Sequence, residues 1–83
     1  MNPVEAAPNH QHQLDTSGLY CPEPIMLLHQ KMEEIQVGEV LLIIATDPAT
    51  QRDIPKFCTF LQQELLMQQE DEQSYHYWIK KQS

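Results

Sequence analysis

Six consecutive apolar residues near the middle of the chain constrain its fold most strongly. The run Val40–Ala45 has no alternation of polar and apolar side chains, so a strand formed by it has two faces to cover. One face can pack against helices. The other face, with Leu41 and Ile43, would be only partly covered in a two-layer domain. That exposure would indicate either a partner surface or a central strand between bulky neighbours.

Segments on both sides of this run have the periodicity of amphipathic helices. In residues 22–36 the apolar side chains recur at steps of three and four and form one buried stripe of Ile25, Leu28, Met32 and Ile35. Gly38 then favours a helix end. A second helix is predicted from residue 48 to residue 65 or 66. Its stripe is Ile54, Phe57, Cys58, Leu61 and Leu65.

The start of the second helix has two alternatives. Asp47, followed by a proline, can cap the helix, whereas Thr50 and Asp53 form a pattern similar to a capping box. Because Pro55 would break an established helix, we expect an irregular first turn and then a regular helix. Cys58 lies within the apolar stripe, which indicates a core residue rather than a nucleophile.

The remaining ordered segments are predicted strands at residues 14–17, 66–70 and 74–80. The last segment is rich in β-formers, and Tyr75, Tyr77 and Ile79 alternate with His76, Trp78 and Lys80, so that one set faces the helices. The order is β-α-β-α-β-β, which predicts one α/β (α+β) domain over residues 14–83. We expect residues 1–13, which are polar and loop-like, to be a disordered tail.

Composition limits the classes of function. A chain of 83 residues buries about 60–65% of its unfolded surface, which leaves little room for a deep cavity and favours chemistry on an exposed residue. Twelve acidic residues against five Lys and Arg give a formal charge of −7. Direct binding to nucleic acid is therefore not expected, because it needs clustered cations. The acidity suits a protein that meets basic partner surfaces, although solubility alone explains it equally well.

The first residues and the cysteines bear on location. Residues 1–5 lack the basic start and apolar run of a signal peptide, and no segment has the ~20 apolar residues of a membrane span. We therefore expect a cytoplasmic protein, in which free thiols are the default and a reactive thiol is an option. His10 and His12 have no Cys or acidic partners at ligand spacing, so neither a metal nor a cofactor is expected.

The motif Cys21-Pro22-Glu23-Pro24 carries the chemistry, directly before the first helix. A cysteine at a helix start lies at the positive end of the helix dipole, where a thiolate is favoured. The alternative is a small buried cysteine before a proline-capped helix. Because both prolines lack amide protons and Glu23 adds a negative charge, we expect the pKa of Cys21 to fall by less than about one unit. The sequence assigns no general base. The absence of a second cysteine three positions on argues against a dithiol oxidoreductase.

Three stretches carry a family signature: Gly18-Leu19-Tyr20-Cys21-Pro22-Glu23-Pro24, Asp47-Pro48-Ala49-Thr50 and Arg52-Asp53-Ile54-Pro55. Together they resemble the TusA/SirA-like sulfur-carrier family over about four-fifths of the chain. The resemblance implies a two-layer sandwich with two helices on one face of a four-stranded mixed sheet. It also implies that Cys21 accepts sulfane sulfur from a cysteine desulfurase as a persulfide. A TusBCD-type acceptor would then receive the sulfur, towards 2-thiolation of wobble uridine in tRNA.

The chain also departs from the family. Members often carry Arg directly before the cysteine, where this chain has Tyr20, and the basic candidates of the first helix are His29 and Lys31 alone. Both departures reduce the positive charge around the thiol. Two alternative functions stay open, namely a regulatory interaction module and a carrier for another sulfur pathway. As a carrier, the protein would be a persulfide relay of the sulfurtransferase type rather than an independent turnover enzyme.

Overall fold

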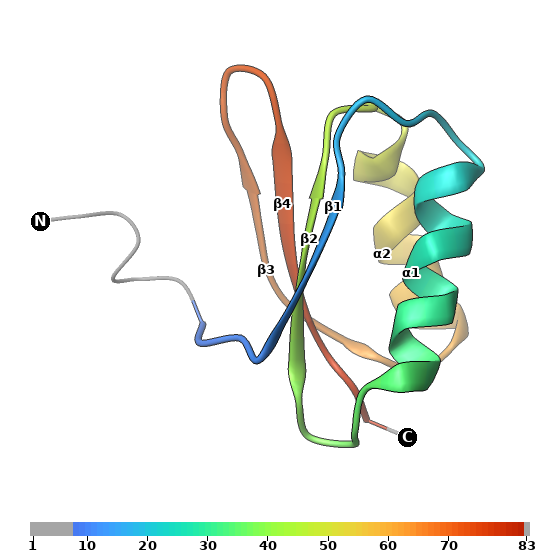
Figure 1. Cartoon of the computed structure of the whole chain (residues 1–83), viewed down its shortest axis with the longest axis vertical. Helices are drawn as coiled ribbons and strands as arrows, with labels where there is room; N and C mark the ends of the chain where they lie inside the picture. Colours follow the sequence, from blue (N-terminus) through green and yellow to red (C-terminus); the bar gives the residue numbers. More distant parts are fainter. Residues whose placement is uncertain (1–7, 83) are drawn as a thin grey trace, which may run out of the picture.

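The computed structural model describes residues 8–82. The elements are β1 (His12–Thr16), α1 (Glu23–Glu34), β2 (Val40–Ala45), α2 (Thr50–Phe60), β3 (Glu64–Glu70) and β4 (Tyr75–Lys80). The predicted order and the two-layer architecture are confirmed, with the sheet on one side and the helices on the other (Figure 1).

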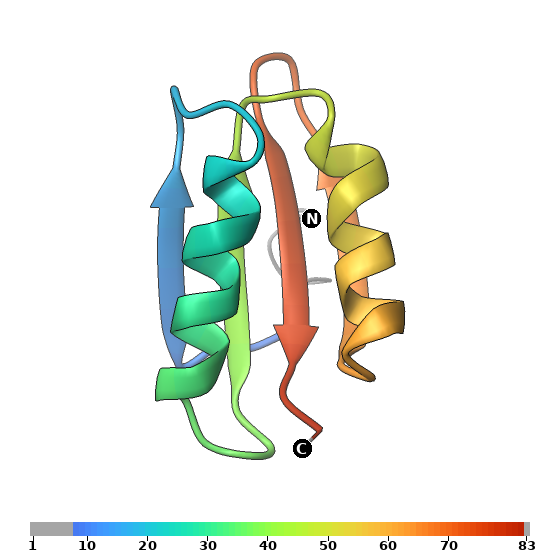
Figure 2. The ribbon, with the colours of Figure 1, turned by 90° about the vertical axis from the view of Figure 1, so that its right-hand side faces the viewer.

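The four strands form one mixed sheet in the order β1-β2-β4-β3. β1 and β2 are parallel, and β4 pairs antiparallel with both β2 and β3. Both helices cover the same face of this sheet, as the view in Figure 2 shows. The parallel pair matters for the site, because the loops that follow β1 and β2 leave the sheet at the same end.

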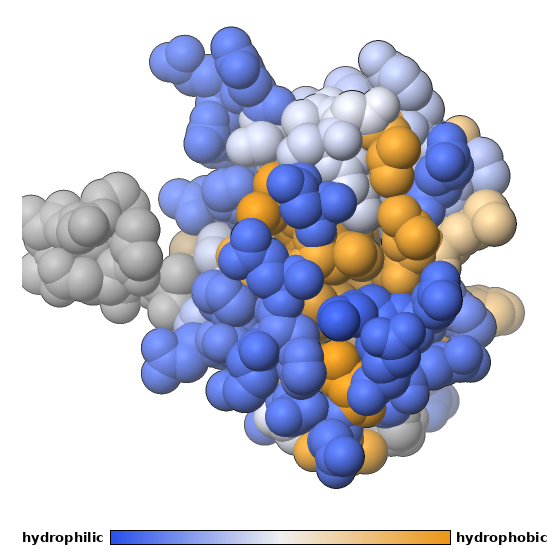
Figure 3. All heavy atoms as spheres, viewed as in Figure 1, coloured by the Kyte–Doolittle hydropathy of each residue, from blue (hydrophilic) through white to orange (hydrophobic). Residues whose placement is uncertain are grey.

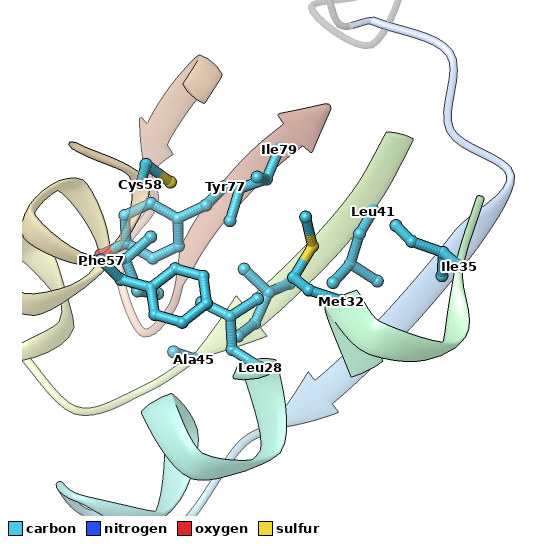
Figure 4. Packing of buried hydrophobic residues seen from close by; sticks show 11 residues of the cluster. Leu28, Met32, Ile35, Leu41, Ala45, Phe57, Cys58, Tyr77 and Ile79 are labelled. Carbon is cyan, nitrogen blue, oxygen red and sulfur yellow. The ribbon is translucent and has the colours of Figure 1, made fainter. Parts of the chain in front are cut away.

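The main core lies between the sheet and the helices. Leu28 and Met32 from α1 and Phe57 and Cys58 from α2 pack against β2 and β4 (Figure 4). Ile54 of α2 belongs to the same core. Tyr77 and Ile79 belong to this core and Tyr75 packs against it, which confirms the face predicted for β4.

The expectation for the two faces of β2 is wrong. Leu41 and Ile43 are fully buried under the helices, whereas Val40 and Leu42 face the opposite side and form a small cluster with Trp78. The pleat of a strand sends alternate residues to opposite faces. A strand with only apolar residues therefore does not reveal which set faces the helices, and the pairing with neighbouring strands decides it.

The first strand begins two residues earlier than predicted. His12 and Gln13 are part of β1, so the expectation of a tail up to residue 13 is wrong for these two residues. The backbone amide of Gln11 also donates to the carbonyl of Val40 at 3.1 Å. The His12 ring contacts the Glu39 carboxylate at 2.8 Å, which gives a polar residue a partner beside the sheet. Residues 1–7 lie outside the described residues.

The second helix ends five or six residues before the predicted end. It stops at Phe60, and β3 begins at Glu64, so that Leu65 contacts the core from a strand instead of a helix. The amide of Gln63 donates to the carbonyl of Cys58 at 2.8 Å, and Gln62 has a positive φ of 59°. This pattern is a Schellman motif, which normally ends a helix at a glycine.

The surface is largely hydrophilic on the face seen in Figure 3, with a limited apolar area near its middle. Within residues 8–82, neither helix has the length and apolar character that a membrane crossing requires.

Candidate functional site

Cys21 lies in the loop between β1 and α1, at the end of the sheet where the β2–α2 loop also lies (Figures 1 and 2). Helix α1 begins at Glu23 and Pro22 is its N-cap, so the cysteine precedes the cap by one residue. Pro22 and Glu23 are exposed, whereas Pro24 is fully buried beneath the loop. The Cys21–Pro22 peptide bond is cis.

Asp47 connects this loop to the start of α2. Its Oδ2 accepts a hydrogen bond from the backbone amide of Cys21 at 2.8 Å, and its Oδ1 accepts one from the amide of Ala49 at 3.0 Å. These bonds, with that from Cys21 first, lower the pKa of the Asp47 carboxyl below its ordinary value. Only 8% of Asp47 is exposed. The backbone around the cysteine is therefore fixed by a buried carboxylate on the neighbouring loop.

Neither predicted cap forms at the start of α2, which begins at Thr50, two residues after the predicted residue 48, with Ala49 as an N-cap that has no side-chain hydrogen bond. Asp47 instead accepts the amide of Ala49, in the turn before the helix. The Thr50 hydroxyl donates to the carbonyl of Asp47 at 2.7 Å and shares a hydrogen bond with the Tyr77 hydroxyl, so it forms no capping box with Asp53. The amides of Thr50, Gln51 and Arg52 donate to carbonyls three residues earlier. This confirms the irregular first turn, and the helix then continues through Pro55.

The thiol of Cys21 faces a second carboxylate. Its Sγ donates to Oδ2 of Asp53, in the first turn of α2, at 3.0 Å. This hydrogen bond is the largest cause that raises the pKa of Cys21 to about 12, followed by partial burial and by Asp47. A thiol bonded to a carboxylate ionises reluctantly, because the thiolate loses the bond and meets a like charge.

The expectation of a mildly acidified thiol is therefore wrong. The backbone amide of Glu23 donates to the carbonyl of Tyr20 at 2.9 Å, so it offers no hydrogen bond to the sulfur. Pro22 and Pro24 have no amide proton to offer. The dipole of α1 therefore acts on Cys21 without a direct donor, whereas Asp53 acts through a hydrogen bond.

An open groove between α1 and α2 adjoins the cysteine. It has a volume of about 760 Å³ and is lined by Cys21, Pro22, Ile25, Asp53, Pro55 and Phe60. A second hollow continues it past Met26 and His29. Phe60 is 86% exposed and Met26 is 63% exposed. The site is thus an accessible thiol at one end of an apolar surface, rather than a closed active-site pocket.

Cys58 has the opposite environment. It is 3% exposed and packs in the main core beside Tyr77, which confirms its predicted place (Figure 4). Burial raises the pKa of its thiol to about 11. Both cysteines are free thiols. Within residues 8–82, no group of three or more His, Cys, Asp or Glu is placed to hold a metal ion.

Sequence reasoning missed the contact between Asp53 and the thiol, although both residues lie in the signature stretches. The signal that could have revealed it is topological. In a parallel pair, the loops after both strands emerge at the same edge of the sheet. The Oγ1 of Thr46 accepts a bond from the amide of Gly18 at 2.8 Å, which also connects these loops.

Comparisons with known proteins place this geometry in context. The family model "Sulfurtransferase TusA" matches residues 12–81. The chain is 58% identical over 72 residues to the sulfur carrier protein TusA of Pseudomonas entomophila (strain L48), covering 87% of this chain and 90% of the relative. It is 59% identical over 68 residues to that of Pseudomonas putida (strain GB-1), covering 82% of this chain and 85% of the relative.

A solved structure shows the same fold. The crystal structure of a SirA-like protein from Desulfitobacterium hafniense matches with a TM-score of 0.76, covering 88% of this chain and all of that chain. The two sequences are 15% identical, so this likeness concerns the fold alone.

Proposed function

We propose that Cys21 carries sulfane sulfur as a persulfide between a donor and an acceptor protein. The proposal starts from the family, because this chain belongs to the TusA sulfurtransferase family. The observation that carries the proposal is the contrast between the cysteines. Cys21 is partly exposed at an open groove, on a loop fixed by Asp47, whereas Cys58 is buried. A carrier needs one thiol that two different proteins can reach.

In the accepting step, the donor is a cysteine desulfurase that holds the sulfur as a persulfide, R–S–SH. The Cys21 sulfur attacks the outer sulfur of the donor, a new S–S bond forms on Cys21, and the S–S bond of the donor breaks. The donor leaves as a thiolate and takes up the proton that Cys21 loses. One persulfide and one thiol enter and leave, so the step needs no external oxidant.

The delivering step is the same exchange in the opposite sense. A thiol of the acceptor attacks the outer sulfur on Cys21, which returns to the thiol form. We propose an acceptor of the TusBCD type and, beyond it, 2-thiolation of the tRNA wobble uridine. The carrier itself does not bind nucleic acid in this proposal, in keeping with its charge of −7. Such a relay works in the cytoplasm, where thiols stay reduced.

A second candidate is an interaction module that uses the same surface without carrying sulfur. One observation favours it, since a thiol with a pKa of about 12 is almost wholly protonated at neutral pH. In the carrier proposal, the donor complex must overcome this protonation.

The experiment is sulfur loading followed by intact-protein mass spectrometry. With a cysteine desulfurase and cysteine, the wild-type protein should gain one sulfur atom that a reductant removes. The Cys21→Ser variant should gain none, and Cys58→Ser should load like the wild type. Loading of Cys21→Ser would exclude Cys21 as the carrier residue. No loading of the wild type with several desulfurases would exclude the carrier and favour the interaction module.

A further inference from the structure

The contact between the Cys21 thiol and Asp53 has a consequence for sulfur transfer. We propose that Asp53 is a positioning residue that holds Cys21 as a neutral thiol while the carrier is empty, through a hydrogen bond from Sγ that is lost when Sγ bonds to the outer sulfur. This inference rests on the proposed carrier function. According to it, Asp53 interacts favourably with the empty carrier and unfavourably with the loaded one.

The geometry orients one oxygen of Asp53 toward the sulfur. Oδ2 accepts the thiol proton at 3.0 Å, whereas Oδ1 lies 3.5 Å from Nε of Arg52. The Asp53 side chain is 28% exposed, so solvent competes for it only in part. On the other side of the bond, Asp47 fixes the amide of Cys21 at 2.8 Å. Donor and acceptor are thus both restrained by the fold before a partner arrives.

The covalent structure of a persulfide removes the donor of this bond. In the empty state, Sγ bears one hydrogen atom, and this atom bonds to Asp53. In the loaded state, Sγ is bonded to Cβ and to the outer sulfur, and it has no hydrogen. The carboxylate then faces a disulfur group without a donor on its inner atom. When the persulfide is ionised, its negative charge lies close to the negative charge of Asp53, and this repulsion disfavours the ionised form.

The same carboxylate therefore acts in opposite directions on the two states. It stabilises the empty thiol and destabilises the loaded anion, so it biases the carrier toward delivery of its sulfur. An acceptor thiol benefits from this bias. A donor must work against it, by taking up the thiol proton as its own thiolate leaves.

Other charged groups near the thiol determine how large the effect of a variant will be. Asp47 lies on the loop before α2, Arg52 and Lys56 lie on α2, and Glu23 is the first residue of α1. Asp53 makes the largest contribution to the raised pKa of the Cys21 thiol, and Asp47 makes a smaller one. Removal of the Asp53 charge leaves the cations of Arg52 and Lys56 on the same helix, and both favour a thiolate.

The first test measures the pH dependence of Cys21 alkylation by iodoacetamide in the unloaded protein, with peptide mass spectrometry to separate Cys21 from Cys58. Asp53→Asn should shift the profile to lower pH and speed the reaction at pH 8 by at least about tenfold, which corresponds to one pKa unit. Asp53→Glu keeps the charge and should stay closer to the wild type. Glu72→Gln makes the same charge change in the exposed β3–β4 turn and should leave the profile unchanged.

The second test measures sulfur retention. Loaded wild-type and loaded Asp53→Asn proteins are mixed with glutathione, and the fraction of Cys21 that keeps its sulfur is followed by mass spectrometry. Once the exchange with glutathione has reached equilibrium, a several-fold larger fraction of the variant than of the wild type should still carry its sulfur. Circular dichroism and thermal unfolding of each variant establish that the fold is intact, and Asp53→Glu supplies a second variant if Asp53→Asn is unstable.

The outcomes separate this proposal from the carrier function. Wild-type loading with identical alkylation profiles for wild type and Asp53→Asn would refute the role of Asp53 and leave the carrier function standing. A shifted profile with unchanged retention would refute the bias toward delivery. If neither protein loads, the carrier function and the transfer role of Asp53 both fail, whereas a shifted profile would still confirm the hydrogen bond.

Discussion

At the scale of single residues, the two cysteines have raised pKa values for different physical reasons. Burial alone raises the pKa of Cys58 to about 11, whereas a hydrogen bond to Asp53 is the main cause of the pKa of about 12 at Cys21. Burial blocks approach as well as ionisation. A hydrogen bond at an open groove blocks only ionisation, and a docked partner can change it.

Replacement of the core cysteine should separate stability from sulfur transfer. Cys58→Ser places a hydroxyl in an apolar site, which should lower the free energy of unfolding by roughly 1–3 kcal/mol. Loading with sulfur should continue, because Cys21 is unchanged. Urea denaturation and intact mass measure the two effects, and Cys58→Ala is the control without a buried hydroxyl. Normal stability with lost loading would contradict both expectations.

The limits of sequence reasoning are clear at these residues. The spacing of apolar side chains predicted the core position of Cys58, because a helical stripe is a local pattern. The protonation state of Cys21 was not predictable in this way. Its decisive partner, Asp53, is 32 residues away and reaches it only through the parallel pairing of β1 and β2.

At the scale of the elements, the ends of α2 depend more on contacts with distant parts of the chain than its middle does. The chain has no glycine after Phe60, so the sequence pattern predicted that the apolar stripe of the helix continues through Leu65. In the fold, Gln62 adopts the left-handed conformation that ends the helix, and Leu65 enters β3. The stripe predicted the helix, but pairing of β3 with β4 determined where it stops.

The unusual conformation of Gln62 gives a prediction for this element. A left-handed conformation costs a non-glycine residue about 1–2 kcal/mol, whereas the greater freedom of glycine in the unfolded chain costs about 0.4–1 kcal/mol. Gln62→Gly should therefore raise the free energy of unfolding by about 0.5–1 kcal/mol. Gln62→Ala, which keeps the penalty, is the matched control. Urea denaturation of both variants is the measurement, and equal effects would contradict the Schellman end of α2.

At the scale of the whole molecule, one topological feature joins fold and site. The parallel pair β1–β2 brings two loops to one end of the sheet, and these loops supply Cys21 and Asp47, with Asp53 following in the first turn of α2. The helices that form the core also form the walls of the groove. The order of elements and the family signature predicted this architecture. The contacts between the loops required the assembled fold.

The two raised thiol pKa values predict how the stability of the molecule depends on pH. A group whose pKa is higher in the folded than in the unfolded state stabilises the fold below its unfolded pKa, and this contribution is lost as pH rises through the folded pKa. For both thiols the ordinary value is 9.0, and the folded values are about 12 for Cys21 and about 11 for Cys58. The free energy of unfolding should therefore be insensitive to these thiols at pH 8 and should fall as pH rises above 9.

The contribution of Cys21 can be isolated by comparison with Cys21→Ser, because lysine and tyrosine residues titrate in the same range in both proteins. The difference in unfolding free energy between wild type and variant should be constant up to about pH 8. Between pH 9 and pH 12 the wild type should lose stability relative to the variant, because only the wild type loses the bond of a neutral thiol to Asp53. Urea denaturation under reducing conditions at intervals across this range measures the difference. A difference that stays constant to pH 11 would mean that Asp53 does not hold the thiol proton in solution.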